Sequence, residues 1–90
     1  MQVQVSINKM YSGRMQIFVR RITPSASTGP VVTYPEEAEV KKVLAAFGFS
    51  KDVIDGRLEI LSEFGPNESL QFPEADISLE LLHAHGFAAI

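Results

Sequence analysis

Polar and hydrophobic residues alternate at the start of the chain, and this pattern predicts its first elements. Val3, Val5 and Ile7 are separated by polar residues, which is the period of a strand with one buried face. We predict a strand over residues 2–10. A short turn containing glycine follows, and residues 14–23 are rich in β-branched and aromatic side chains. These two strands are expected to form a hairpin.

The pattern changes from strand to helix near residue 35. Residues 24–30 are proline, glycine and small side chains, typical of a loop, and residues 31–34 predict a short third strand. Apolar residues then recur with helical spacing, so one face of a helix over residues 35–47 must be buried. These apolar residues are Val40, Val43, Leu44 and Phe47. Acidic residues at the start and Gly48 at the end suit the two ends of a helix.

Two stretches of the chain resemble each other at an offset of 38 residues. Residues 34–49 and 72–87 align without a gap, and both begin with an aromatic residue, a proline and a glutamate. Both end with a leucine followed four and five residues later by glycine and phenylalanine, which is the signature of a helix stop. The likeness predicts a second helix. It fits either an internal duplication or helix-stop chemistry shared by two unrelated helices.

Residues 50–64 fit two interpretations. In the first, Ser50 caps a helix that ends before Gly65 and Pro66. Its buried face would consist of Val53, Ile54, Leu58 and Leu61. In the second, Asp55–Gly56 is a turn and residues 57–63 form a strand. The alignment at offset 38 places Ile22 on Ile60 and favours the second interpretation, with a further strand at 69–72 before the last helix.

These elements predict a single α+β domain over residues 1–90. We expect an antiparallel sheet of about five strands with two helices on one face, in the order β-ββα-ββα, with an internal duplication at offset 38 as a candidate origin. The other face of the sheet would be open. We expect it to expose part of Phe18, Ile22, Leu61 or Tyr34.

Composition limits the classes of function. The chain has 90 residues, of which 46% are hydrophobic and 21% charged, which is the composition of a folded domain. It has no cysteine, so disulfides and thiolate metal sites are excluded. A net charge of −3 disfavours nucleic acid and anionic membranes as partners. Without a signal-peptide pattern or an apolar run of roughly 20 residues, a cytoplasmic location is expected.

The titratable residues do not form a pattern typical of an active site. His83 and His85 are two positions apart on the predicted helix, so their rings point in nearly opposite directions and cannot share a metal ion. Asp52 with Asp55 and Glu59 with Glu63 are close pairs of carboxylates, but nothing positions them for acid and base catalysis. No phosphate-binding glycine loop is present. We expect no enzymatic activity, no cofactor and no metal.

Two segments offer alternatives based on nucleic acid. Strand residues 14–21 carry Arg14, Arg20 and Arg21 around Phe18, the combination that binds single strands. Residues 43–61 have the spacing of a helix-turn-helix. In that segment, the helix that would enter the DNA groove carries Asp52 and Asp55, which repel phosphates. It also contains Gly56, which weakens a helix.

The main functional prediction is a small, non-enzymatic protein-interaction module, an inhibitor or adaptor, acting through an exposed face or edge of the sheet. Its partner is expected to be another protein or a second copy in a homodimer. The candidate binding residues are Arg14, Phe18, Arg20, Ile22 and Tyr34.

The alternatives are a nucleic-acid-binding regulator and an acidic, phage-type decoy that inhibits a nucleic-acid-binding protein. The decoy requires carboxylates gathered on one side of the molecule. They would be Glu36, Glu37, Glu39, Asp52 and Asp55.

Overall fold

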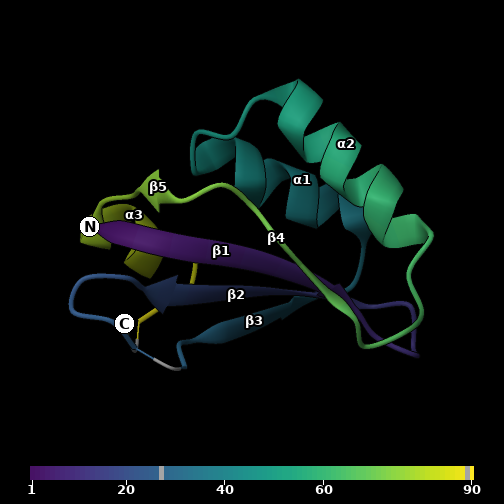
Figure 1. Cartoon of the computed structure of the whole chain (residues 1–90), viewed down its shortest axis with the longest axis horizontal. Coiled ribbons are helices and arrows are strands. Elements are labelled where there is room, and N and C mark those ends of the chain that lie inside the picture. Colours follow the sequence, from purple (N-terminus) through teal and green to yellow (C-terminus); the bar gives the residue numbers. More distant parts are fainter. Residues whose placement is uncertain (27, 89) are drawn as a thin grey trace.

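The structure is a computed structural model that describes residues 1–26, 28–88 and 90. Along these residues the elements are β1 (Gln2–Lys9), β2 (Met15–Arg21), β3 (Val31–Tyr34), α1 (Glu37–Ala46), α2 (Lys51–Ser62), β4 (Ser69–Gln71), β5 (Ala75–Asp76) and α3 (Leu79–Ala84). The five strands form one antiparallel sheet, and the three helices pack on one of its faces (Figure 1). The predicted α+β class and antiparallel sheet are confirmed. Ser27, inside the predicted loop 24–30, lies outside the described residues.

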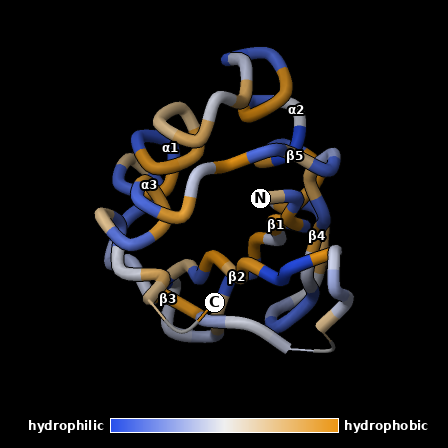
Figure 2. The backbone as a smooth tube through the Cα atoms, turned by 90° about the vertical axis from the view of Figure 1, so that its left-hand side faces the viewer, coloured by the Kyte–Doolittle hydropathy of each residue, from blue (hydrophilic) through white to orange (hydrophobic). Residues whose placement is uncertain are grey.

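The pairing of β1 with β2 determines which side chains face the helices. The strand order is β3-β2-β1-β4, and β5 pairs with the beginning of β1. Val5 lies opposite Val19 and Ile7 lies opposite Ile17, so the odd-numbered residues of both strands share one face. All four side chains are fully buried under the helices. The alternation of hydrophobic and hydrophilic residues is visible along the backbone in Figure 2.

The core joins this sheet face to one side of each helix. Its buried residues are Val3, Val5, Ile7, Met15, Ile17, Val19, Val40, Val43, Leu44, Phe47, Ile54, Leu58, Leu61, Phe72, Ile77, Leu82 and Phe87. The four apolar residues predicted for the buried face of the first helix are all among them. Burial of a large apolar side chain contributes about 1.5–3 kcal/mol, so this cluster is the main source of stability. No helix of the described residues is long and apolar enough to span a membrane.

Both predicted helix stops are present. Gly48 and Gly86 have positive φ angles of 100° and 90°. The next residues fold back on the preceding turn, with hydrogen bonds from Phe49 N to the Leu44 carbonyl (3.3 Å) and from Phe87 N to the Leu82 carbonyl (2.9 Å). Phe47 packs edge-on against Phe87, with the ring centroids 5.7 Å apart. The ends of α1 and α3 therefore meet in the core.

The prediction of a strand over residues 57–63 is wrong, because these residues belong to helix α2 or directly follow it. The Ser50 hydroxyl accepts a hydrogen bond from Val53 N at 3.2 Å, and Ile54, Leu58 and Leu61 point into the core. The cap and the helical spacing decide the structure, and the Asp55–Gly56 turn does not form. The predicted order β-ββα-ββα is therefore wrong: three strands precede two consecutive helices. Along the described residues three helices form rather than two, and the duplication at offset 38 stays unconfirmed.

Two glycine substitutions are expected to change stability in opposite directions. A Cβ at Gly56, within α2, would meet no atom within 4 Å, so Gly56→Ala should raise the free energy of unfolding by about 0.5–1 kcal/mol through helix propensity. Gly48→Ala also meets no atom but needs a positive φ, and should lower it by about 1 kcal/mol. Urea unfolding of both variants tests this. Destabilisation by Gly56→Ala would contradict the helical assignment of residues 51–62.

Candidate functional site

The side of the sheet away from the helices is not covered by any described helix, and we call it the open face. The register places side chains from β1 to β4 on it. They are Gln4, Ser6, Asn8, Gln16, Phe18, Arg20, Val31, Thr33, Ser69 and Gln71. Asp76 pairs with Gln2 and therefore also lies on the open face. Its carboxylate is 2.6 Å from the Met1 amino group. The rest of the face is mainly amides and hydroxyls.

A row of polar side chains crosses three strands of the open face. The Asn8 amide donates to the Gln16 side-chain carbonyl at 3.0 Å, and the Gln16 amide donates to the Thr33 hydroxyl at 3.4 Å. Asn8 is the one buried polar side chain among the described residues, and its Oδ1 has no hydrogen-bond partner there. Because cross-strand pairs hold neighbouring strands in register, this row stabilises the pairing of β1, β2 and β3.

A hollow of about 400 Å³ lies next to this row, between the central strands and the loop that precedes β3. It is lined by Gln4, Ser6, Phe18, Val19, Arg20, Thr28, Gly29, Val31 and Ser69. Arg20 is the one charged residue of this lining. Its Nη1 donates to the Ala26 carbonyl at 3.2 Å, which ties the guanidinium to the loop.

Gly29 brings the loop into direct contact with β2. A Cβ placed on Gly29 would lie 1.8 Å from the Val19 carbonyl oxygen, so any other residue would collide with the strand backbone. The carbonyl of the next residue, Pro30, accepts a hydrogen bond from Val19 N at 3.1 Å. The wall of the hollow therefore depends on a glycine at this position.

The structure brings together two of the five predicted binding residues. Phe18 and Arg20 both line the hollow. Arg14 is exposed in the turn before β2, and Ile22 is half-buried directly after β2. Tyr34 lies opposite Met15 and therefore on the helix side of the sheet, so the expectation that it lies on the open face is wrong.

Tyr34 and Leu61 both lie on the helix side of the sheet. Burial and, to a smaller extent, the Glu39 carboxylate raise the pKa of Tyr34, and its hydroxyl has no hydrogen-bond partner among the described residues. The sequence also predicts that Leu61 lies partly on the open face, and this prediction is wrong. It is buried in α2, because its segment forms a helix instead of a strand. The binding roles of the five residues stay predictions.

The two nucleic-acid alternatives gain no support from these positions. Arg20 and Arg21 are neighbours in β2, so their side chains point to opposite faces of the sheet. The helix-turn-helix-like segment 43–61 does fold as the end of α1, a turn and α2. The apolar side of α2 packs on the core, and its exposed positions include Asp52 and Glu59, which oppose the approach of phosphates.

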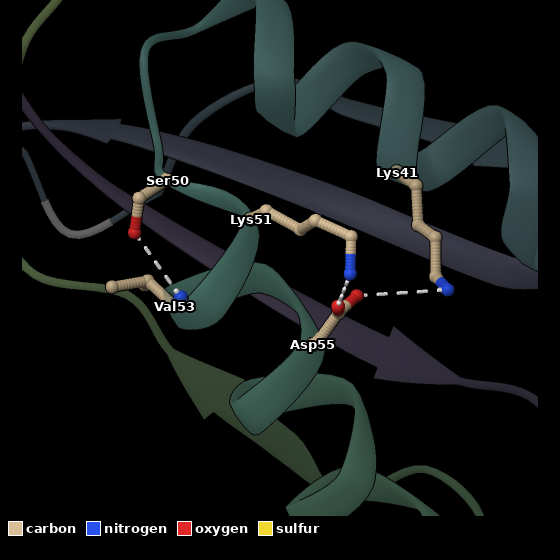
Figure 3. Close-up of polar contacts among 5 residues, drawn as sticks. All are labelled: Lys41, Ser50, Lys51, Val53 and Asp55. Carbon is tan, nitrogen blue, oxygen red and sulfur yellow. Dashed lines mark hydrogen bonds and ion pairs between the residues drawn. The ribbon is translucent and has the colours of Figure 1, made fainter.

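The carboxylates required by the decoy hypothesis do not act as one group. Asp55 lies between two lysines, 2.6 Å from Lys51 Nζ and 3.7 Å from Lys41 Nζ (Figure 3). The hydrogen bond from Lys51 holds the pKa of Asp55 below its usual value, and the same bond raises the pKa of Lys51. Residues 36–39 lie at the start of α1, whereas Asp52 lies in the first turn of α2, which follows the end of α1.

The two histidines are in different environments. The ring of His85 packs edge-on against Phe47, with centroids 5.6 Å apart, while His83 is exposed. Across the described residues, no group of three or more His, Cys, Asp or Glu side chains is arranged to hold a metal ion.

Sequence reasoning missed most of the residues that line the hollow. Gln4 and Ser6 occupy the polar positions of the first predicted strand, so the hairpin register was the signal that would place them beside Phe18 and Arg20. Ser69 reaches the same surface only because β4 pairs with β1. Thr28 and Gly29 have no comparable signal, since the path of a loop is a property of the tertiary structure.

No protein-family model matches the chain, and no significant match to it was found among curated proteins or solved structures. The open face is therefore interpreted from its own geometry and chemistry.

Gly29→Ala is expected to displace the loop from β2 and to destabilise the protein. Because the colliding atom belongs to the backbone of Val19, a side-chain rotation cannot relieve the contact. We expect a loss of about 2 kcal/mol in the free energy of unfolding. Thr28→Ala, at the exposed neighbouring position, should change it by less than about 0.5 kcal/mol. Equal urea-unfolding midpoints for the two variants would show that the loop does not rest on Val19.

The lowered pKa of Asp55 gives a pH-dependent contribution to stability. A depressed carboxyl pKa stabilises the folded state above the unfolded value, about 3.9, and this contribution is lost as the pH falls through the folded value. Asp55→Asn should therefore lower the thermal midpoint at pH 7, with a difference from wild type that shrinks below about pH 4. Glu59→Gln is the control on the exposed side of α2. A difference independent of pH would contradict the role of the ion pairs.

Proposed function

We propose that this chain is a non-enzymatic protein-interaction module that binds a partner protein, in the role of an inhibitor or adaptor, through the open face. The observation that carries the proposal is the hollow on that face, where the half-buried ring of Phe18 lies beside Arg20. An antiparallel sheet often leaves one polar face in water. A concave region that is lined by an aromatic ring and several polar groups is more typical of a binding surface.

The face is favoured over the edges of the sheet as the binding surface. Strand β3 has only four residues and is flanked by Pro30 and Pro35, which lack the N–H that strand addition needs. At the other edge, Arg57 Nε donates to the Gln71 carbonyl of β4 at 3.0 Å, so this acceptor is already occupied. Both edge strands are short, with four residues in β3 and three in β4, whereas the open face offers side chains from four strands.

Neither alternative function is favoured by a specific observation. Arg20 and Arg21 point to opposite faces of the sheet, and Asp55, one of the carboxylates of the decoy hypothesis, is paired with two lysines. The partner in the proposal is a protein, and a second copy of this chain is one candidate. Of the exposed large apolar residues, Val31 lines the hollow on the open face, and Tyr11 and Phe64 line a smaller one of about 210 Å³. Ile60 and Leu79 lie on α2 and α3.

Photo-crosslinking tests this proposal. A benzoylphenylalanine in place of Thr33, on the open face, is irradiated in an extract of the source cells, and the adducts are identified by mass spectrometry. Phe18→Ala should reduce the yield of the specific adduct about tenfold, as expected for a central aromatic contact. Ile60→Ala, which removes an exposed apolar side chain from α2 on the helix side, should leave the yield unchanged.

The same mass spectra identify an adduct formed by two copies of this chain, because it contains peptides of this chain alone. The proposal fails if no specific adduct forms, or if Phe18→Ala and Ile60→Ala reduce the yield equally.

A further inference from the structure

We propose that the hollow binds a carboxylate side chain from an acidic segment of the partner protein, with Arg20 holding the carboxylate and Phe18 packing against the neighbouring side chain. This inference rests on the proposed function and specifies the chemistry of the partner.

Arg20 has a charge and several hydrogen-bond donors that the described residues do not use. The ion pairs found among them join Met1 to Asp76, Lys41 to Asp55 and Lys51 to Asp55, and none involves Arg20. One donor of its guanidinium is used by the Ala26 carbonyl. A guanidinium carries five N–H donors in a planar fork that matches the two oxygens of a carboxylate. Because the loop already restrains this side chain, binding costs less conformational entropy than it would for a free arginine.

The rest of the lining complements a negatively charged group. It contains no carboxylate, although the chain has 11 acidic residues and a net charge of −3. Ser6, Ser69 and Thr28 add hydroxyl groups that can donate to a carboxylate or to a peptide carbonyl. The Gln4 amide is already bonded to the Phe72 carbonyl. The hollow is therefore a local site for an anion in an otherwise acidic protein.

The apolar part of the hollow indicates a peptide segment. Phe18 and Val31 form a surface beside Arg20 that a free carboxylate ion would leave exposed. A side chain adjacent to the bound carboxylate can cover it, and aromatic packing adds about 0.5–1.5 kcal/mol to the apolar area buried. An acidic residue next to an aromatic or aliphatic residue satisfies both halves of the hollow.

Nucleic acid also combines anions with flat rings, but it requires more positive charge than this face carries. Affinity for a strand grows with the number of phosphates that are neutralised, and Arg20 supplies one charge at the hollow. Arg21 points to the other side of the sheet. Arg14 lies in the turn before β2, six residues before Arg20 and at roughly 20 Å from it. One bidentate contact from Arg20 is enough to bind a carboxylate, but it is too little to bind a strand of nucleic acid.

The test is a titration of the ¹⁵N-labelled chain followed by NMR. The probes are acetyl-Glu-Phe-Glu-amide, its neutral counterpart acetyl-Gln-Phe-Gln-amide, sodium acetate, and an eight-nucleotide oligothymidine. We expect the acidic peptide to shift the amide signals of residues lining the hollow, and to bind about tenfold more tightly than the neutral peptide.

Arg20→Gln should weaken binding of the acidic peptide about tenfold, because it removes the charge and the fork. Arg20→Lys, which keeps the charge alone, should give an intermediate loss. Lys42→Gln is the control, since it also removes one positive charge, at an exposed position of α1 outside the hollow, and it should bind as wild type does. Dispersed spectra of all three variants confirm that they are folded.

Several results would overturn the inference. Equal binding of the acidic and neutral peptides, no shifts with either, or equal losses in Arg20→Gln and Lys42→Gln would each show that the hollow does not select a carboxylate. Equal shifts with acetate at the same carboxylate concentration would indicate a site for free anions. Tighter binding of the oligothymidine would indicate a nucleic-acid site. If one of these results is found and Phe18→Ala still reduces the yield of the crosslinked adduct, the open face stands as the interface and only this inference fails.

Discussion

The register of the β1–β2 hairpin is the constraint on which both sides of this molecule depend. With Val5 opposite Val19 and Ile7 opposite Ile17, every odd position of the two central strands faces the helices. The same pairing places Gln4 beside Arg20 and Ser6 beside Phe18 on the open face. A slip of one residue in either strand would exchange its two faces and bury polar groups in the core. The hydrophobic core thus holds in place the surface proposed to bind a partner.

The ends of the helices contribute to the hydrophobic core as much as their apolar faces do. At both glycine stops, a phenylalanine turns back onto the core: Phe87 is fully buried and Phe49 is partly buried. Phe87 meets Phe47 from the end of α1, and Phe49 packs on Phe72, with centroids 4.8 Å apart. Arg57 of α2 lies 5.9 Å from the centre of the same Phe72 ring and bonds to the Gln71 carbonyl. These contacts tie α1, α2, α3 and β4 into one unit.

Charge is distributed so that the two sides of the sheet differ in character. The helix side carries most of the carboxylates, and two of its lysines, Lys41 and Lys51, are paired with Asp55. The hollow on the open face has one arginine and no carboxylate in its lining. Because a protein with a net negative charge generally repels acidic segments, a local site of this kind would bind them through short-range contacts rather than long-range attraction.

Local patterns in the sequence were enough to predict the hairpin, the third strand, the first helix and both helix stops. Each of these depends on residues within a few positions of one another, such as the alternation in residues 2–9 or the turn that joins Leu44 to Phe49. Residues 57–63 were assigned wrongly because a distant alignment outweighed a local signal, the Ser50 cap with apolar residues at helical spacing. That Phe18 and Arg20 lie on the same face of the sheet also follows from the alternation of side chains along a strand.

Only the tertiary structure decided the rest of the site. The pairing of β3 with β2 turned Tyr34 toward the helices, and the pairing of β4 with β1 brought Ser69 to the hollow. The loop contact of Gly29 with Val19 formed its wall. These contacts join residues far apart in the chain, whose relative positions follow from packing and hydrogen bonding of whole elements, and no local pattern encodes them.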